Sequence, residues 1–533
     1  MDDLAPRSSW RARLTQAGLS GVLSGLLGAR TPERFARPLP GPFPGDFAAG
    51  SALVAGTLSL GKNAVALPPP DWRAHESKEL LETLNGFGWL ADLVAAGAND
   101  RARALIADWI DRDTGWHETA WASDVLARRV AAWLTHAGLY ADDDALRPRA
   151  LQSLARQIRH LTRAATDVLA GPAQFDVMAA LALGWAAGLA ARRARAIVDT
   201  LLAAARSEQI LADGGHVSRN PATQLQVLAA LVLTRDALAA AGEDTAALVP
   251  TIAGLAAALR AFLHGDGRLA LFNGADEGDP AVIAAVLARA GAAEAPPLSL
   301  RATGYERIEA GDTMLLIDTG APPPPPFDRD AHAGALAFEL GVGPERVIVN
   351  CGGAPQAEAA WRRAQRATAA HSTAVIDETN SAEIRAEGGF GRRPDSVVVE
   401  RNSADGATWL TAAHDGYVAP FGLIHRRRLY VSAAGDDVRG EDIFEGRNEC
   451  GFVLRFHLHP DVKASLMQTG SAALLRLPSG VAWRFQVAGA ALDIEPSIYL
   501  GRPQVRRGEQ LVAAGRPAGG ATIKWALRRM TVK

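Results

Sequence analysis

The apolar pattern of the chain changes from helical to strand-like near residue 300, and few folds accommodate both halves. From about residue 74 to 294, apolar residues recur at spacings of three and four, between short breaks of Gly, Pro, Asp or Asn. This periodicity predicts helices over 80–96, 99–112, 121–137, 147–169, 175–190, 194–212, 224–241, 250–264 and 280–291. Successive antiparallel helices of this kind build a bundle, a solenoid or a closed α/α toroid.

Short β-type runs follow residue 300, with turn residues between them at intervals typical of a sandwich or a barrel. A run of five prolines at 322–326 must be an extended connector, because proline cannot join a strand ladder. We therefore expect a multidomain α+β protein. Its parts would be an N-terminal extension over 1–70, a helical domain over 71–300 and an antiparallel β domain over 301–533.

The charge balance limits the partners of the chain. With 56 Lys and Arg against 58 Asp and Glu, the formal net charge is −2. A dedicated nucleic-acid binder is usually clearly basic, so that class is excluded, and any anion site must be local. Two cysteines exclude a disulfide scaffold and a Cys-rich zinc module. No apolar run reaches the roughly 18 residues of an integral membrane helix.

The N-terminal segment allows two interpretations. Arg7, Arg11 and Arg13 precede a mildly apolar stretch over 17–29, as in a secretory signal. The serines and glycines in this stretch favour a surface or amphipathic helix instead.

Histidines and arginines gather in two clusters early in the β half. Asp330 and His332 are two apart, so on a strand they share a face, where the histidine could be a base or a metal ligand. The alternative is a loop histidine that caps a turn. Arg366 and His371 follow a run of arginines that suits a carboxylate, or that forms an ordinary solvated basic face.

Two more clusters carry candidate residues. His414 and Tyr417 flank a glycine turn, and His425 and Arg426 follow, so this segment is either a site for proton transfer or a hairpin tip with a bonded Tyr. In the helical half, two glycines end one helix and an Asn-Pro pair begins the next. The loop between them presents candidate residues or ordinary capping groups: His216, Arg219 and Asn220.

Other enzyme classes lack support in the sequence. There is no Gly-x-Ser-x-Gly, no phosphate-binding Gly-rich loop before Lys-Ser/Thr, and no His-Glu-x-x-His. His457 and His459 share one face of a strand, as a metal pair or as surface histidines.

In this order, the motifs resemble the heparinase II/III-like family over residues 70 to 530. The resemblance rests on Asn-Gly-Phe-Gly-Trp at 85–89, Trp-Ala-Ser at 121–123 and Asp-Gly-Gly-His at 213–216. In the β half it rests on the segments around His332 and His371, on His-Asp-Gly-Tyr at 414–417 and on Gly-Glu-Asp at 440–442.

The resemblance implies an α/α toroid, an incomplete barrel of helical hairpins, followed by an antiparallel β-sandwich. It implies a polysaccharide lyase acting on a uronate-containing glycan, such as a glycosaminoglycan or alginate, in the cleft between the domains. Trp89, His216, Arg366, His425 and Arg426 would bind substrate. A structural zinc is also implied, held by His332, His371 and, in place of the family's Asp, Asn350. The periplasm or cell envelope is the implied location, with the cytoplasm as the alternative.

The chain departs from the family at its catalytic positions. The family's catalytic Tyr would fall within 220–224, where this chain has no Tyr. The family's Asn-His pair would fall within 171–174, where this chain has neither residue. Asp330 occupies the position of the first His in the family's His-x-His element. A lyase built on this chain therefore needs substitutes. Asn220 or Arg219 would neutralise the uronate carboxylate, and Tyr417 would be the acid. The base would be one of His332, His371 and His414.

Three functions follow from these observations. The first is a carbon–oxygen lyase acting on an acidic polysaccharide, and the second is a non-catalytic glycan-binding or cell-envelope protein on the same fold. The third is a toroid glycoside hydrolase, for which Asp111, Asp113, Glu118 and Asp213 supply carboxylates.

Overall fold

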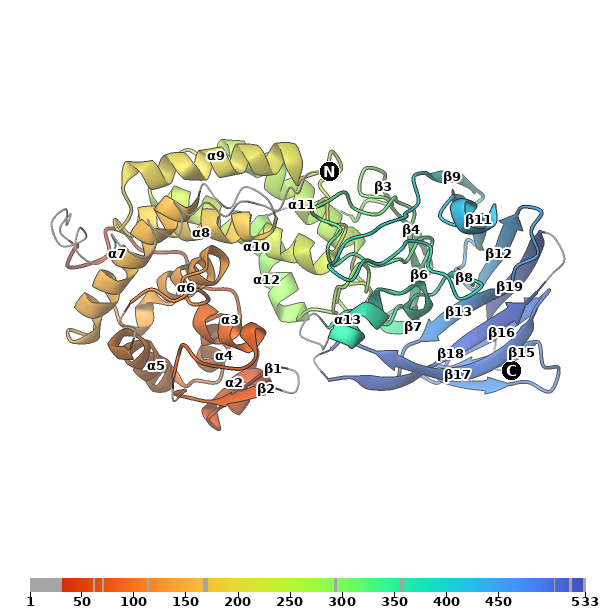
Figure 1. Ribbon diagram of the computed structural model, residues 1–533, viewed down its shortest axis with the longest axis horizontal. Helices are drawn as coiled ribbons and strands as arrows, with labels where there is room; N and C mark the ends of the chain where they lie inside the picture. The colour runs from red at the N-terminus through yellow and green to blue at the C-terminus, as the bar shows by residue number, and fades with distance from the viewer. Residues whose placement is uncertain are drawn as a thin grey trace, which may run out of the picture. The chain divides into compact units, whose positions relative to one another are not determined.

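The computed structural model describes residues 31–530 except 61–62, 70, 113–114, 166–170, 292–294, 355–358, 503 and 517–519 (Figure 1). The N-terminal stretch with Arg7, Arg11 and Arg13 lies outside the described residues. The chain divides into two compact units. Unit 1 comprises Met1–Leu169, Ala173–Leu201 and Leu233–Thr245, and unit 2 comprises Ala170–Pro172, Leu202–Val232 and Ala246–Lys533.

Unit 1 is built from helices, apart from one hairpin of β1 (Thr57–Leu60) and β2 (Asn63–Ala66). Its helices are α2 (Phe47–Val54), α3 (Lys78–Gly86), α4 (Leu90–Ala95), α5 (Asn99–Arg112), α6 (Ser123–Thr135), η1 (Ala137–Leu139), α7 (Leu146–Ala164) and α8 (Ala173–Ala186). It also takes the first part of α9 (Arg192–Glu208) and the last part of α10 (Pro221–Ala240). The sequence of α8 is apolar on every side, which suits a helix that is buried all round.

Aromatic rings fill the core of unit 1. Phe87 packs edge-on against Trp133 with ring centroids 5.4 Å apart, and Trp109 packs edge-on against Trp133 at the same distance. Arg129 lies buried over the Trp109 ring and donates to the carbonyl of Asn85. The α3–α6 region is therefore fixed by packing of large side chains rather than by surface ion pairs.

Unit 2 joins helices to two antiparallel sheets. After η3 (Ala246–Leu248) come α11 (Val249–Ala261) and α12 (Pro280–Ala290), and later α13 (Ala359–Arg366), η4 (Thr368–Ala370) and α14 (Val418–Phe421). Phe262, just after α11, packs against Tyr305 of β4, with ring centroids 5.0 Å apart. This contact is part of a buried cluster that joins the helices to the first strands.

One sheet has nine strands. Its order is β17-β18-β13-β7-β6-β5-β4-β3, with β8 also paired to β13. The strands are β3 (Ser299–Leu300), β4 (Tyr305–Ala310), β5 (Thr313–Asp318), β6 (Phe338–Val342), β7 (Glu345–Val349), β8 (Ala374–Ile376), β13 (Phe452–Leu458), β17 (Ala491–Tyr499) and β18 (Arg506–Gly515).

The other sheet has eight strands in the order β14-β15-β16-β19-β12-β11-β10-β9. They are β9 (Val397–Ala404), β10 (Ala407–His414), β11 (Ile424–Val431), β12 (Asp437–Glu445), β14 (Lys463–Leu466), β15 (Ala472–Arg476), β16 (Ala482–Ala488) and β19 (Ala521–Arg529). Phe338 of β6 stacks on Trp525 of β19 with ring centroids 5.5 Å apart, so the two sheets share one core. This arrangement is a β-sandwich, as the strand pattern and the resemblance predicted.

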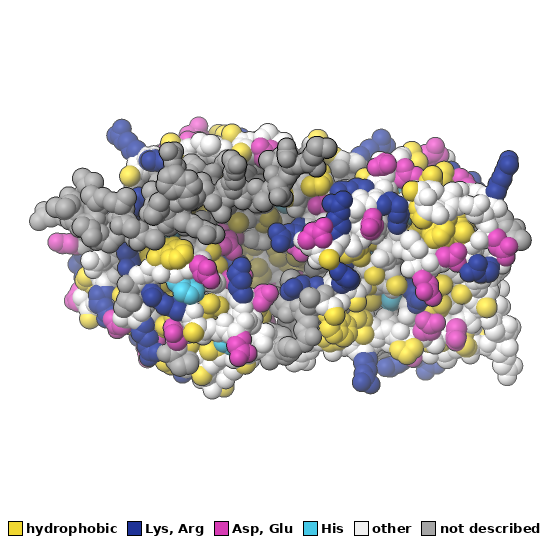
Figure 2. Space-filling model, in the orientation of Figure 1, with side chains coloured by type: hydrophobic (Ala, Val, Ile, Leu, Met, Phe, Trp, Pro, Cys, Tyr) yellow, Lys and Arg dark blue, Asp and Glu magenta, His cyan; other side chains and the backbone are white. Residues whose placement is uncertain are grey.

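On the face shown in Figure 2, charged and apolar side chains of the described residues are mixed. Within the residues that the structure describes, no helix is long and apolar enough to span a bilayer.

Candidate functional site

Two histidines from separate segments of unit 2 form a hydrogen-bonded pair. Nδ1 of His332 lies 3.1 Å from Nε2 of His371, and Nδ1 of His371 lies 2.9 Å from the carbonyl oxygen of Ala367. A carbonyl only accepts, so His371 carries its proton on Nδ1 and accepts at Nε2. His332 must then donate from Nδ1, which leaves a lone pair on its Nε2.

Both histidines are neutral at pH 7. Burial lowers the pKa of His371 to about 4. Burial, with the nearby His371 and Arg366, holds the pKa of His332 well below its ordinary value. Among the described residues, none forms a hydrogen bond with Nε2 of His332, so this nitrogen is an available acceptor.

A glycine lies beside that nitrogen. Gly274 has φ +87°, and a Cβ built on it would lie 3.2 Å from Nε2 of His332 and 3.8 Å from Nδ2 of Asn220. The left-handed backbone favours glycine here, and a larger residue would crowd both nitrogens. The structure thus brings together two of the predicted residues, His332 and Asn220, which stand 112 positions apart in the sequence.

Asn220 is held by the start of α10. Its Oδ1 accepts from the backbone N–H groups of Ala222 and Thr223, as an N-cap does, and Pro221 occupies the first helical position. Its Nδ2 donates to the carbonyl of Asn273 over 2.7 Å. An amide carries two N–H groups, so one of them remains to donate to a ligand.

Asn273 positions both partners, and the sequence analysis did not single it out. Its Oδ1 accepts from the backbone N–H of His332, and its Nδ2 donates to the carbonyl of Arg219 and to the hydroxyl of Tyr305. The residue is buried with φ +49°. The Asn-Gly dipeptide at 273–274 signals only a turn, because asparagine tolerates the left-handed region.

The loop that carries Asn273 and Gly274 is fastened at its far end by Glu277. This buried carboxylate accepts from the hydroxyl of Tyr499 over 2.5 Å and from Nε of Arg502 over 2.9 Å. The backbone N–H of Glu277 also donates to the carbonyl of Gly501. We refer to these contacts as the Glu277 anchor.

Arg219 is committed to the protein rather than to a ligand. Its guanidinium pairs with Asp318 and donates to the carbonyls of Thr303, Gly304 and Ala321. His216 is also buried, and its ring lies 2.8 Å from the hydroxyl of Ser218. Arg219 thus fastens the α9–α10 loop to the segments around β4 and β5, whereas the bond from His216 to Ser218 lies within the loop.

The predicted residues of the His-Asp-Gly-Tyr segment lie inside the β-sandwich. Tyr417 is fully buried and donates its hydroxyl to the carbonyl of Ala374 over 2.8 Å. His414 lies 3.3 Å from His425, which in turn lies 2.8 Å from Asp442. Each of these side chains is satisfied by another protein group, and the chain of bonds lies within the core.

The remaining predicted substrate-binding residues are spread over both units. Arg426 pairs with Glu445 on the surface of β11, and Arg366 donates to the carbonyls of Ala331 and Gly389. Trp89 belongs to unit 1, is buried and donates to the carbonyl of Leu84. The hydrolase carboxylates are dispersed in the same way: Asp111 pairs with Arg149, Asp213 accepts from Thr303, and Asp113 is outside the described residues.

Two of the three predicted zinc ligands lie side by side. His332 Nδ1 and His371 Nε2 face each other at a separation that suits two ligands of one metal ion. Asn350, the third predicted ligand, accepts from the N–H of Ser372 at Oδ1 and donates to Glu339 at Nδ2. Within the described ranges, no three His, Cys, Asp or Glu side chains form a group that could hold a metal ion. Zinc binding stays a prediction, and no step below depends on it.

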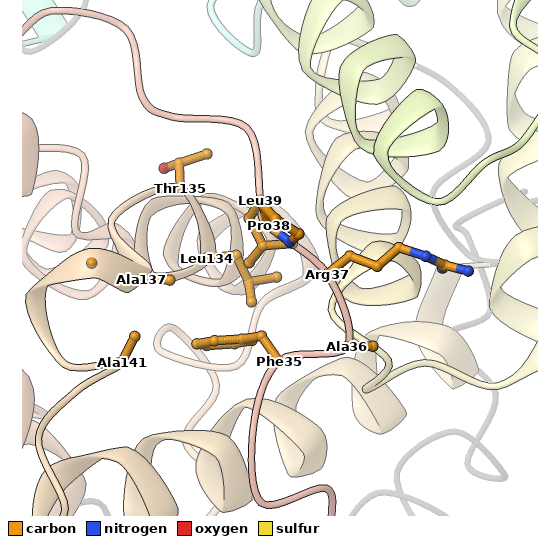
Figure 3. Close-up of a pocket in the computed structure, with 10 residues that line it drawn as sticks. Phe35, Ala36, Arg37, Pro38, Leu39, Leu134, Thr135, Ala137 and Ala141 are labelled. Atoms are coloured by element: carbon orange, nitrogen blue, oxygen red, sulfur yellow. The ribbon is translucent and has the colours of Figure 1, made fainter.

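A cavity of about 440 Å³ in unit 1 offers less chemistry. It is lined by Phe35, Ala36, Arg37, Pro38, Leu39, Leu134, Thr135, Ala137, Gly138 and Ala141. Figure 3 shows Phe35, Pro38, Leu39 and Leu134 gathered at it, while the Arg37 guanidinium points away. The hydroxyl of Thr135 is bonded to the carbonyl of Ala131. We therefore place the candidate site at His332 and Asn220.

A region of helices followed by an antiparallel β-sandwich is the architecture of the heparinase fold. Residues 292–526 match the family model described as heparinase II/III-like, C-terminal. The chain belongs to the heparinase II/III-like family, of which it is a divergent member.

A curated relative and several solved structures support this assignment. FtsZ-localized protein C of Caulobacter vibrioides is 34% identical over 525 residues, which cover 92% of this chain and 89% of that protein. The crystal structure of heparinase III matches with a TM-score of 0.68 at 13% identity, covering 87% of this chain and 80% of that one. A heparan sulfate lyase mutant from Pedobacter heparinus matches at 0.61 and 14% identity, covering 91% and 83%. At these identities the solved structures establish the fold alone.

Proposed function

We propose that the protein is a lyase-like enzyme that cleaves a uronate-containing acidic polysaccharide by β-elimination, with His332 as the base. One observation carries this proposal. Nε2 of His332, whose lone pair has no partner among the described residues, and Nδ2 of Asn220 both lie beside Gly274.

The reaction requires a donor and a base side by side. The proton on C5 of the uronate leaves, the C4–O4 bond breaks, and a C4–C5 double bond forms. Because this C–H is barely acidic, a hydrogen bond to the carboxylate must stabilise the carbanion-like state, and the Asn220 amide supplies it. Nε2 of His332 takes the proton, and the departing O4 receives one from the His332 imidazolium or from water.

The test is ultraviolet absorbance of the new double bond over a panel of uronate polymers. The wild-type protein should produce it on one of them, and His332→Gln and Asn220→Ala should each reduce the rate by about 100-fold or more. His75→Gln, a half-buried histidine in a loop of unit 1, serves as the matched control and should keep the full rate. Absence of the signal on every polymer, with folded protein, would refute the proposal.

The pH profile provides a second readout. Because burial and two neighbouring groups lower the pKa of His332 well below 6.5, the base stays neutral as the pH falls. The acid limb of the rate profile should therefore lie well below pH 6.5. A limb at the ordinary histidine pKa would assign the base to a different, exposed group.

A second candidate is a non-catalytic glycan-binding or cell-envelope protein. It is favoured because three residues predicted as catalytic bond to other groups of the protein: Arg219, His414 and Tyr417. It is also favoured by the 34% identical relative, whose name places that protein with FtsZ. For this candidate, a fluorescent fusion should follow FtsZ in the cell, and glycan binding should survive His332→Gln without any double bond forming.

A further inference from the structure

One face of α7 in unit 1 carries positive charge without any acidic partner on the helix. Arg159 and His160 each lie three or four positions from both Arg156 and Arg163, so the four residues share one side of the helix. No Asp or Glu occurs within α7. At the other end of the helix, Arg147 and Arg149 are paired with Asp144 and Asp111.

Arg159 and Arg163 are exposed and uncompensated. Throughout the part of the chain that the structure describes, neither forms a hydrogen bond or an ion pair. Like charges one helical turn apart destabilise a helix slightly, so the unpaired Arg159 and Arg163 carry a cost that a bound anion would remove. The neighbouring charges act on one another: burial, then Arg163 and Arg156, lower the pKa of Arg159.

An aromatic ring adjoins these cations. The guanidinium of Arg156 lies 5.0 Å from the ring centre of Trp121, and the His160 ring packs edge-on against the same indole at 5.2 Å. The indole N–H of Trp121 is buried and has no hydrogen-bond partner among the described residues. A ligand acceptor that reached this N–H would supply its missing partner.

We infer that this face of α7, with Trp121, binds the acidic polysaccharide. Arg159 and Arg163 would pair with carboxylate or sulfate groups of the glycan, since guanidinium binds such planar anions through two hydrogen bonds. The two residues are about 6 Å apart along the helix axis, so they can engage one extended chain. The choice of a glycan as ligand rests on the proposed function.

The apolar face of α7 argues against a membrane as the partner. Leu151, Leu154, Ile158 and Leu161 are buried in the core of unit 1, so the helix has no apolar face left to insert into a bilayer. Only its charged face is available to a ligand.

The test is calorimetric titration of the full-length protein with heparin and with polygalacturonate. Arg159→Ala/Arg163→Ala should weaken binding about tenfold or more, and the remaining binding should depend less on salt. Arg192→Ala/Arg193→Ala is the matched control, because it removes two exposed arginines from the first turn of α9 in the same unit. The control should bind as the wild type does.

Three outcomes would overturn the inference. In the first, the two double variants bind the polymers with equal affinity. In the second, the wild type binds neither polymer. In the third, Arg159→Ala/Arg163→Ala still binds the polymers as the wild type does but no longer binds phosphatidylglycerol vesicles. The proposed function fails separately. If the polymers bind through α7 but are not cleaved, the inference about α7 holds and the proposed lyase activity is refuted. If Arg159→Ala/Arg163→Ala cleaves the polymer with an unchanged KM, the lyase activity holds and the inference about α7 is refuted.

Discussion

Asn273 connects four groups through one side chain and one carbonyl, and its Asn-Gly dipeptide marks it only as a turn residue. Its side chain bonds to His332, Arg219 and Tyr305, and its carbonyl receives Asn220. The position of the candidate base relative to the candidate carboxylate-binding amide therefore depends on this one residue.

Replacing Asn273 by alanine should destabilise the protein by about 2–4 kcal/mol, because several buried groups lose their partner together. Urea denaturation measures this, with Asn402→Ala on the exposed edge strand β9 as the control that should change little. A shift of the same small size in both variants would contradict the role assigned to Asn273.

Arg427 and Arg428 are neighbours on β11 with opposite environments. Arg427 is fully buried and pairs with Asp442, while Arg428 is 55% exposed and lies 3.7 Å from Glu441. Arg427→Ala leaves a buried carboxylate without its main cation and should cost about 3–5 kcal/mol. Arg428→Ala should cost less than about 1 kcal/mol, and equal midpoints in chemical denaturation would show that Asp442 does not need the ion pair.

At the scale of elements, the helix predicted over 80–96 is divided by the structure into α3 and α4. Phe87 adopts φ +57° between Gly86 and Gly88, and its ring stacks on Trp72 with centroids 5.5 Å apart. The free energy gained by burying the Phe87 ring outweighs the hydrogen bonds lost by interrupting the helix. The ring's partner is 15 positions away in the sequence, so the periodicity of apolar residues does not reveal it.

The close packing of β12 against β19 can be tested by substitution. A Cβ on Gly440 would lie 2.1 Å from the ring of Trp525, which is part of the sandwich core. Gly440→Ala should lower stability by about 1–3 kcal/mol or more. Gly138→Ala, where no atom lies within 4 Å and φ is not positive, should be neutral or slightly stabilising in a thermal melt.

Across the whole molecule, buried neutral histidines make stability depend on pH. Burial lowers the pKa of His216 and His371 to about 4 and that of His457 to about 3. In the unfolded chain these groups bind protons below pH 6.5, whereas the folded protein does not until its lower pKa is reached. These histidines therefore do not reduce the free energy of unfolding above pH 6.5, and they lower it progressively as the pH falls from 6.5 to about 4.

Each such histidine should contribute a slope of about 1.4 kcal/mol per pH unit once the pH is below 6.5. Urea titrations at pH 7, 6 and 5 measure the total slope, and His457→Gln should reduce it, whereas His75→Gln should not. A flat dependence over this range would mean that these histidines are protonated in the folded state.

Much of the architecture could be predicted from the sequence, and the side-chain contacts could not. The helix predicted over 99–112 coincides with α5, and α10 begins at Pro221 as its Asn-Pro start predicts. These features depend on periodicity and capping, which act over a few residues. The pairing of His332 with His371, and of Asn220 with Asn273, depends on chain segments tens of residues apart, and periodicity carries no information about such contacts.

Because of the Glu277 anchor, the loop with Asn273 and Gly274 depends on a segment near the C-terminal end of unit 2, so the protein cannot be divided between them without loss. Glu277 and Tyr499 are 222 positions apart, yet the second holds the loop that presents Asn273 and Gly274. A fragment that stops short of β17 would keep every residue of the candidate site and lose the support that orders it. Shortening the C-terminus, or exchanging the last strands with those of another family member, should therefore disturb the site as much as a substitution within it.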